Sequence, residues 1–487
     1  RSAMFWRWAW PDNARYLGSR LGRELSQGTL HPAWAMGLYF RLRQQRIYLR
    51  GDGVRRDNFD AIANLYPQAL GWLDALFTAT SAACVTGLVV VDTATYFTFS
   101  GQLFLLALIQ LGGLGMIGFT TLIILALGKR LSLRAEALSH GASAEVAPDL
   151  DVSRLGRDIV TFTLVIEAVG AALLYMLWVP EYGWAGAVWP AVFHSVSAFC
   201  NAGFVVFQNS MMGAQTSELV LLIIAGLVVV GSLGFLTLEE FAQWRRALTG
   251  RRRFRMSLHS RIALVTTGAL LMVGWAAFSV FEWHHALSGL TVSEKLTNAL
   301  FMSTMPRSGG FNAVDYGEAT QSTSFLTIIL MFIGGSPGST AGGIKVTTFA
   351  LIGLLALSRF RGQEIVHAWG RSIPEETIQR AVGLAVVAFS VVTASIFLFT
   401  WTETDQSSGV GATTDFLAHM FEAASSFNTV GLSMNVTHRL SEPGRLLSVL
   451  MMFIGRVGPL TFAAALALRR NRQANDYRYA YEDVVVG

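Results

Sequence analysis

Long runs without a charged residue alternate along this chain with short polar segments. Five runs of 20 or more residues contain no Asp, Glu, Lys or Arg: 93–128, 219–238, 262–281, 319–344 and 381–402. A helix of about 20 apolar residues crosses a hydrocarbon core about 30 Å thick. A soluble protein would need five buried helices without a charged face. The pattern therefore predicts a multi-pass, all-α membrane protein.

Shorter apolar segments lie between these runs, and each is followed by the same kind of glycine-containing motif. We expect short helices at about 71–83, 186–199, 294–306 and 414–427, and none of them is long enough to span. Each is followed by a few extended residues, a glycine, and then Leu or Phe. The glycines, at intervals of 107–121 residues, are Gly87, Gly203, Gly310 and Gly431. A unit that recurs at this spacing predicts a fourfold internal repeat.

The repeat divides the chain into six parts. Two further spans contain one charge each, at about 159–180 (Glu167) and 446–468 (Arg456). We expect a basic N-terminal segment with the first span (1–70), four pore repeats (71–130, 155–243, 258–360 and 376–470) and a polar tail (471–487). Each repeat is predicted to run span, re-entrant helix, extended loop, span.

The first span is the weak point of this scheme. The longest apolar piece of residues 1–58, His31–Phe40, is too short to cross a bilayer, and arginines follow it closely. Two explanations remain open: an altered reading frame near residues 35–65, or an unusual first helix.

The distribution of charge sets the topology. Only 14% of residues are charged, against about 25% in soluble domains. The net charge of +5 comes from basic loops that follow the second span of each unit. By the positive-inside rule these loops and both termini are cytoplasmic, so the basic balance indicates membrane topology and no nucleic-acid partner. The two cysteines, Cys84 and Cys200, each precede a repeat glycine and do not form a disulfide framework.

The repeated loop has the features of an ion filter. Non-helical backbone at membrane depth is tolerated where it is buried in protein or lines a water-filled cavity. Four such loops around one axis could replace the hydration shell of a cation with carbonyl oxygens. The negative, C-terminal ends of the short helices would favour a cation at the centre. We therefore expect a potassium-channel-like fold with one central pore.

The hydrophobic stretch after the third loop is interrupted. Residues 331–345 contain five glycines and Pro337, so they cannot form one regular helix. We interpret this segment as a gating loop under the filter, and a kinked, tightly packed helix is the alternative. Arg456 is an intramembrane charge and thus a functional candidate, with an ion pair to Glu422 or Glu167 as the structural alternative. Lys345 either joins the gate or marks the membrane boundary.

Three other polar residues have structural interpretations. We expect Asp74 at the positive N-terminus of a pore helix, Glu422 behind the fourth filter loop, and His194 packed within the second pore helix.

The motifs resemble the KtrB/TrkH superfamily of potassium-translocating membrane subunits, and its KtrB branch most closely. The resemblance covers about residues 70–487. It depends on motifs that include Val85-Thr86-Gly87-Leu88, Gln110-Leu111-Gly112-Gly113, Asn201-Ala202-Gly203-Phe204, Gly342-Gly343-Ile344-Lys345 and Gly455-Arg456-Val457-Gly458.

The resemblance implies potassium uptake at a bacterial plasma (inner) membrane, one pore per subunit, a homodimer and a cytoplasmic nucleotide-binding regulatory ring like KtrA or TrkA. No covalent cofactor is implied. Potassium would bind the filter carbonyls, with sodium as an activator or a coupled ion. Glycine in all four repeats is similar to the potassium-preferring members. Cysteine at 84 and 200, and Arg-Ser-Gly-Gly-Phe at 307–311, depart from the usual pattern.

The residues carried over from the family form two sets. The filter set is Cys84, Val85, Thr86, Gly87, Cys200, Asn201, Ala202, Gly203, Ser308, Gly309, Gly310, Asn428, Thr429, Val430 and Gly431. The gating set is Gly334, Gly335, Ser336, Pro337, Gly338, Ser339, Gly342, Gly343, Lys345 and Arg456.

Two other function classes require features that differ from this pattern. A secondary cation carrier would use broken helices in two inverted halves. The sequence instead predicts four repeats of one direction, with a single strongly broken span. An intramembrane enzyme would need a nucleophile or a metal-ligand cluster within the spans, and the sequence has no such pattern, so we expect no enzyme.

Overall fold

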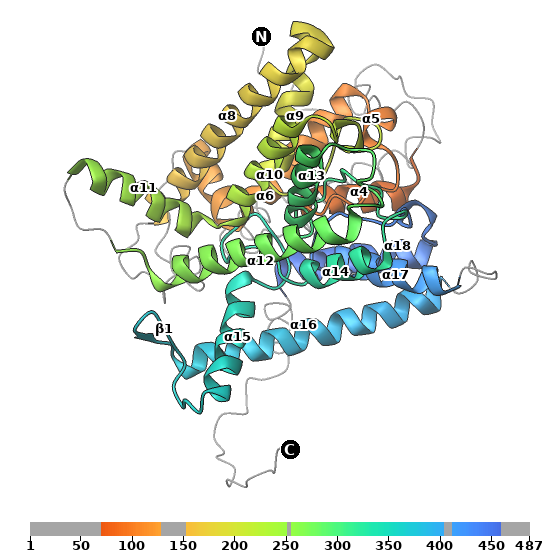
Figure 1. Cartoon of the computed structure of the whole chain (residues 1–487). Coiled ribbons are helices and arrows are strands. Elements are labelled where there is room, and N and C mark those ends of the chain that lie inside the picture. The colour runs from red at the N-terminus through yellow and green to blue at the C-terminus, as the bar shows by residue number, and fades with distance from the viewer. Residues whose placement is uncertain (1–69, 128–151, 251–254, 404–411, 459–487) are drawn as a thin grey trace, which may run out of the picture.

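The computed structural model describes residues 70–127, 152–250, 255–403 and 412–458. The predicted first span and the C-terminal tail lie outside these ranges, so both remain predictions. Within the described ranges the chain is almost entirely helical (Figure 1), which confirms the all-α prediction. A two-residue strand pair, β1 (His367–Ala368) and β2 (Arg371–Ser372), joins two of the helices.

Four short helices lie near the middle of the molecule and point into it. They are α4 (Trp72–Ala83), α9 (Val188–Phe199), α13 (Val292–Thr304) and α17 (Ala412–Phe427). Each begins and ends within two residues of its predicted position. At the start of α13, the Thr291 side chain accepts from the Glu294 N–H, and the Glu294 carboxylate accepts from the Thr291 N–H. This capping box satisfies backbone donors that a helix leaves free at its start.

Among the described residues, three long apolar helices can cross a membrane. They are α8 (Val152–Gly186), α12 (Leu258–Glu282) and α16 (Glu375–Thr402). The chain is therefore a multi-pass membrane protein in its described part. The expected end of the second-repeat span at Pro180 is wrong, because α8 continues past that residue and its backbone departs from helical geometry at Gly183.

The second spans of the first two repeats depart from the predicted straight helix, and that of the third is interrupted as predicted. In α6 (Phe99–Leu127) the backbone breaks at Gly115, and α10 (Glu218–Ser232) and α11 (Phe235–Gly250) are bent by 100°. In the third repeat, α14 (Gln321–Met331) and α15 (Val346–Phe360) flank the predicted interruption. The last of these helices, α18 (Glu442–Val457), ends at a left-handed Gly458. The prediction of a single strongly broken span is therefore wrong.

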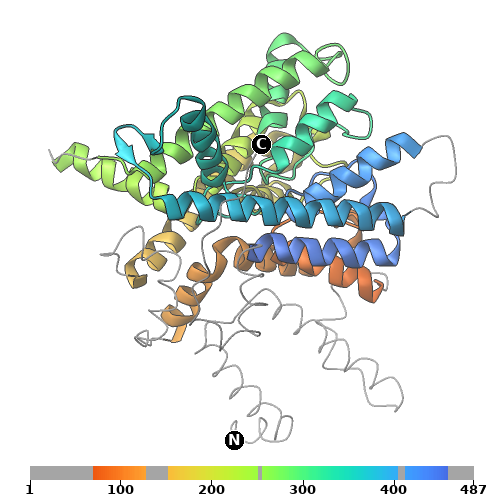
Figure 2. The same ribbon diagram turned by 90° about the horizontal axis from the view of Figure 1, so that it is seen from below.

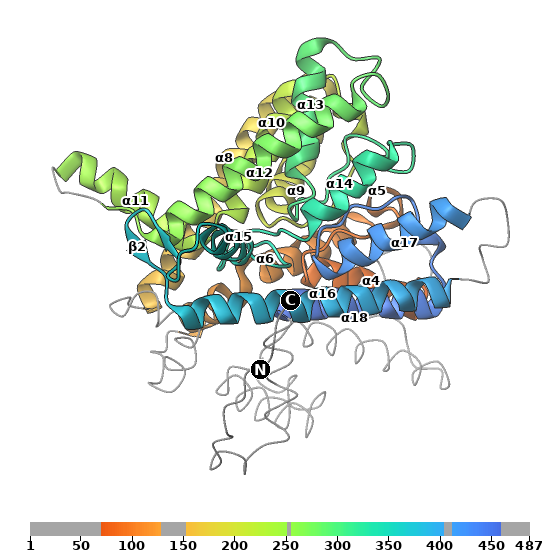
Figure 3. The same ribbon diagram turned by 60° about the horizontal axis from the view of Figure 1, so that its bottom comes forward.

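The helices close into a ring in chain order. The second span of each repeat contacts the short helix of the next: α6 meets α9, α10 meets α13, and α14 meets α17. The ring closes where α18 contacts α4, as Figures 2 and 3 let the reader follow. An ion pair between Asp74 of α4 and Arg445 of α18 joins the first repeat to the last. Asp74 thus lies in the first turn of α4, where the sequence places it.

Three small elements lie outside the main helices. They are α5 (Thr93–Tyr96), η3 (Met212–Ala214) and η5 (Thr437–Arg439).

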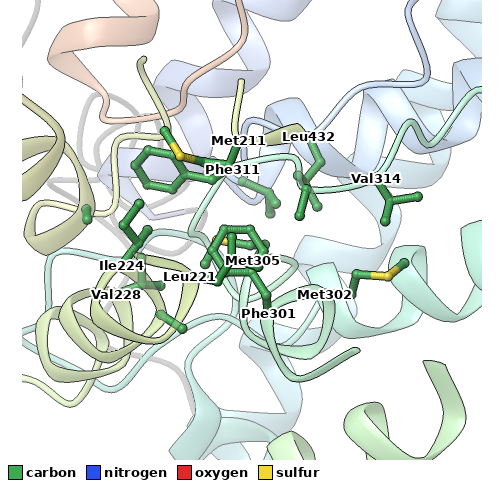
Figure 4. Close-up of a cluster of buried hydrophobic side chains, with 14 of the residues drawn as sticks. Met211, Leu221, Ile224, Val228, Phe301, Met302, Met305, Phe311, Val314 and Leu432 are labelled. Carbon is green, nitrogen blue, oxygen red and sulfur yellow. The ribbon is translucent and has the colours of Figure 1, made fainter. Parts of the chain in front are cut away.

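The largest hydrophobic cluster joins three repeats around the short helix α13 (Figure 4). Leu221 and Val228 of α10 pack with Phe301 and Met305 of the third repeat, and Leu432 belongs to the fourth. A fully buried Phe or Leu contributes about 1.5–3 kcal/mol to stability. A close-packed core of this kind transmits strain and holds the loops at its edge in fixed positions.

Candidate ion pathway

The four repeat glycines lie against one another in a closed ring. A Cβ atom built on Gly203 would lie 2.8 Å from the Cα of Gly310, and one built on Gly431 would lie 3.0 Å from the Cα of Gly87. A Cβ on Gly87 would lie 3.1 Å from the Cα of Gly203, and one on Gly310 would lie 2.7 Å from the carbonyl oxygen of Val430. The contacts follow chain order, first repeat to second, third, fourth and back. Only glycine fits such close approaches of backbone.

The carbonyl oxygen before each glycine faces the glycine of the preceding repeat. Gly87 lies against the oxygen of Ala202, Gly203 against that of Gly309, Gly310 against that of Val430, and Gly431 against that of Thr86. No donor among the described residues gives a hydrogen bond to these four oxygens. Four equivalent oxygens, one from each repeat, therefore accept no hydrogen bond from the described residues, although a buried carbonyl is normally paired.

The same left-handed backbone occurs twice in each loop. The glycines have φ of 95°, 68°, 76° and 91° at positions 87, 203, 310 and 431. Two residues earlier, the non-glycine residues Val85, Asn201, Ser308 and Thr429 have φ of 56°, 60°, 77° and 48°. Such a residue costs about 1–3 kcal/mol and persists where the surroundings fix it, typically at functional sites.

A serine of the preceding short helix holds two of the loops in the same way. In the first repeat the Thr86 N–H donates to the Ser81 carbonyl (2.8 Å) and the Gly87 N–H to the Ser81 hydroxyl (3.1 Å). In the fourth, the N–H groups of residues 430 and 431 donate to Ser425 at 2.9 and 3.1 Å. In the second, the Ala202 N–H donates to the Ser197 carbonyl at 2.7 Å. These bonds occupy the amide donors and leave the carbonyls for another ligand.

Glycines of the second spans make a further contact to which sequence reasoning gave no role. Gly112, Gly231 and Gly455 lie directly against the carbonyl oxygens of Ala83, Phe199 and Phe427, the last residues of α4, α9 and α17. A Cβ atom at any of the three would overlap that oxygen. The sequence signal for these residues is a glycine at the same place in the second spans of the first, second and fourth repeats.

The predicted gating segment lies against the start of the predicted filter loops. It is non-helical between α14 and α15 and includes Gly334, Gly335, Ser336, Pro337, Gly338, Ser339, Gly342 and Gly343. The Thr340 hydroxyl lies 3.2 Å from the side-chain amide of Asn201, and the Gly342 N–H donates to the Ser308 hydroxyl at 3.3 Å. Gly343 packs against the side chain of Asn428. One segment thus contacts three of the four loops.

Backbone bonds hold this segment at both ends. The Gly334 N–H donates to the Ile344 carbonyl (2.8 Å), which brings the two ends of the segment together. The Ser336 N–H donates to the Ser232 carbonyl (2.8 Å), and the Phe235 N–H donates to the Gly338 carbonyl (3.0 Å). The segment is therefore hydrogen-bonded to the second repeat at the bend between α10 and α11.

Arg456 bonds to backbone rather than to a carboxylate. Its guanidinium donates to the carbonyl oxygens of Thr340 in the segment and Gly112 in α6. The alternative ion pair with Glu422 or Glu167 does not form in the described part of the chain. Lys345 Nζ donates to the Ala341 carbonyl at 2.7 Å. Both cations therefore contact the segment itself.

Two other predicted residues are placed as follows. Glu422, on α17, accepts from the hydroxyls of Ser433 (2.9 Å) and Thr437 (2.6 Å), so it braces the chain that follows the fourth loop. His194 is fully buried and its ring stacks on Phe207 at 4.7 Å, which confirms that it is a packing residue.

Comparison with known proteins agrees with this arrangement. The profile of the TrkH family, described as cation transport protein, matches residues 40–475. Potassium/sodium uptake protein NtpJ of Enterococcus hirae is 36% identical over 422 residues, which are 85% of this chain and 90% of that protein. Ktr system potassium uptake protein B is 40% identical in Vibrio alginolyticus, over 81% of this chain and 84% of the relative. The Bacillus subtilis protein of the same name is 37% identical, over 86% and 90%.

A solved structure has the same fold. The potassium transporter TrkH from Vibrio parahaemolyticus superposes with a TM-score of 0.62 and 17% identity, covering 82% of this chain and 78% of that one. At this identity the likeness supports the fold alone. From the profile match and the relatives that are more than one-third identical, the chain belongs to the TrkH family of cation transport proteins.

Proposed function

We propose that this chain takes up potassium across a bacterial plasma membrane through a channel-like pore. As a member of a cation transport family it is a transporter and not an enzyme. The observation that carries the proposal is the ring of four equivalent carbonyl oxygens, at Thr86, Ala202, Gly309 and Val430, that accept no hydrogen bond from described residues. Carbonyl oxygens arranged around one point can replace the hydration shell of a potassium ion.

The surroundings of the ring favour a cation. Four short helices aim their C-terminal ends at the loops, and those ends carry partial negative charge. Glycine at positions 87, 203, 310 and 431 lets the four backbones meet. Two relatives are named for potassium uptake and one for potassium/sodium uptake. We assign potassium as the main ion and leave sodium as an activator or a coupled ion.

The segment at residues 332–345 and Arg456 are proposed to form the gate. The segment lies against three filter loops on the side where the short helices end, and Arg456 bonds it to α6 through Thr340 and Gly112. A fixed positive charge beneath a cation filter opposes the entry of a cation. Opening would require the segment to move, and its glycines allow the necessary change of backbone angles.

Two partners complete the proposal. We propose a homodimer, and a cytoplasmic nucleotide-binding ring that acts on the basic loops of the inner side. Two relatives are named as components of Ktr systems, which supports a regulatory partner. We also propose that both termini are cytoplasmic.

The carrier alternative is less favoured by the geometry. The second spans of the second and third repeats are both broken, which resembles the broken helices of carriers. However, the contacts between repeats run in one cyclic sense around the ring, from α6–α9 to α18–α4. A carrier of two inverted halves would not have this fourfold order.

The test is rubidium uptake, with sodium competition, in a bacterium that lacks its own potassium uptake and expresses this chain with and without a ring partner. We expect saturable rubidium uptake that potassium inhibits far better than sodium, and that increases with the ring partner. Absence of rubidium uptake in both strains would refute the proposed function. Uptake strictly proportional to an inward sodium gradient would favour the carrier.

A further inference from the structure

A buried carboxylate lies behind the second filter loop and does not belong to the filter or the gate. Glu167, in the middle of α8, is only 5% exposed. One of its oxygens lies 3.7 Å from Cys200 Sγ, and the other accepts from Gln110 Nε2 at 3.2 Å. The Glu167 backbone carbonyl accepts from the Ser195 hydroxyl at 2.7 Å. The residue therefore touches α6, α9 and the first residue of the loop.

No cation neutralises this carboxylate within the described ranges. Its polar partners there are an amide N–H and a thiol S–H, and both can donate to it. Burying an acid costs free energy unless the acid is hydrogen-bonded. An ionisable residue within a membrane-spanning helix is therefore a candidate for a functional role.

The second repeat differs at this point from the described parts of the first and third. Cys84 occupies the place of Cys200 in the first repeat, and it packs with Leu76, Phe77 and Met452. No described side chain hydrogen-bonds to its thiol. In the third repeat, the Ser303 hydroxyl donates to the Leu271 carbonyl as Ser195 does to Glu167, so an apolar side chain stands at the matching position. At this point of the first span, the second repeat thus has an acid where the third has a leucine.

The network can control where the second loop lies. Cys200 directly precedes the strained Asn201 and the Ala202 carbonyl of the ring. Gly113 of α6 packs against the Cys200 side chain, and Gln110, one turn earlier, lies 3.7 Å from its sulfur. Movement of Cys200 toward or away from Glu167 would shift the backbone of the loop. The carboxylate therefore fixes this loop from behind, with donors supplied by two repeats.

We propose that Glu167 is a positioning residue for the second filter loop, acting through Cys200 and Gln110 to set the preference of the pore for potassium over sodium. The inference rests on the proposed function, because it assigns a role in selectivity to a pore that must first conduct. Glu167 does not touch the ion. Its effect is on the distance between the Ala202 oxygen and its three counterparts.

The test compares variants of the full chain reconstituted in proteoliposomes. The measured quantity is the sodium concentration that halves rubidium uptake. Glu167→Gln keeps the shape of the side chain but replaces one carboxyl oxygen with an amide N–H group, so Gln110 or Cys200 loses its acceptor. An ordinary hydrogen bond is worth roughly a two- to tenfold change in an equilibrium. We expect the half-inhibiting sodium concentration to fall about three- to tenfold. A side chain that only fills space would leave it unchanged in this variant.

Cys84 supplies the matched control. The effects of Glu167→Gln and Cys200→Ala should be non-additive, so that the double variant is about as impaired as either single one. The effects of Glu167→Gln and Cys84→Ala should instead multiply, because no contact joins those two residues. Gln110→Leu, which removes the N–H donor, should reproduce the selectivity change of Glu167→Gln.

Several outcomes would overturn the inference. One is an unchanged half-inhibiting sodium concentration in Glu167→Gln. Another is that Glu167→Gln is as non-additive with Cys84→Ala as with Cys200→Ala. Thermal unfolding of the purified variants gives a second measurement of the same coupling, and it applies even where a variant does not transport. Absence of rubidium uptake in the unaltered protein would instead refute the proposed function, and coupling in unfolding alone would then leave Glu167 as a structural residue.

Discussion

Replacing Gly203 with alanine tests the ring of glycines most directly. Gly203 has a φ of 68°, and its Cα faces that of Gly310. An added Cβ would lie 2.8 Å from the Gly310 Cα, 3.0 Å from its carbonyl carbon and 3.2 Å from the Gly309 oxygen. All three contacts are with backbone, so no side chain can turn away to relieve them.

The cost can be worked from two terms. A left-handed residue that carries a Cβ costs about 1–2 kcal/mol, which alone corresponds to roughly a five- to thirtyfold change in an equilibrium. The overlap with the third loop adds to this and is relieved only if the second and third loops separate. Separation enlarges the space between the ring oxygens, and a larger space selects poorly between potassium and sodium.

The assay is rubidium uptake with sodium competition in proteoliposomes. We expect Gly203→Ala to fold, to bind rubidium at least five times more weakly and to lose most of its discrimination against sodium. Gly226→Ala is the control, because Gly226 lies in α10 with no atom within 4 Å of its added Cβ. Alanine there should leave transport intact and stabilise the helix by about 0.5–1 kcal/mol. A folded Gly203→Ala protein with unaltered selectivity would refute the reasoning.

Three further predictions follow from the described contacts. Arg456→Ala, or deletion of residues 334–343, should increase rubidium flux because the segment loses its bond to α6; unchanged flux in both variants would contradict the gate. Asp74→Asn and Arg445→Met should each lower the free energy of unfolding by about 1–2 kcal/mol, and the double variant by no more than either, as a thermal unfolding cycle would measure. Cys84 and Cys200 are free and buried, so a maleimide should label neither in the folded protein and both after denaturation; rapid native labelling would show that the loops open.

The short helices and the extended loops that follow them could be predicted closely from sequence. Each short helix ends where small residues give way to the extended motif, and a repeat seen four times fixes the boundary better than one copy. The interruption at Gly334 to Gly343 was equally evident, because glycine and proline cannot continue a helix. The packing of His194 also followed from its apolar neighbours.

Breaks in the other second spans could not be predicted in the same way. Gly115 and Gly234 lie in apolar runs that are the same on both sides, so hydropathy gives a continuous span. The bend at Gly234 forms because the third-repeat segment bonds to the chain on both sides of it, at Ser232 and Phe235. Those partners lie about 100 residues away, and only the tertiary structure brings them together.

The sequence by itself determined that this is an all-α membrane protein and predicted one unit repeated four times, since charge-free length and a recurring glycine depend on local chemistry alone. Tertiary structure decided which atoms meet: that the four glycines touch in chain order, that Arg456 bonds to backbone carbonyls instead of an acid, and that Glu167 reaches Cys200. The physical reason is that such contacts are fixed by how packed helices close on one another, and residues distant in sequence carry no local sign of their partners.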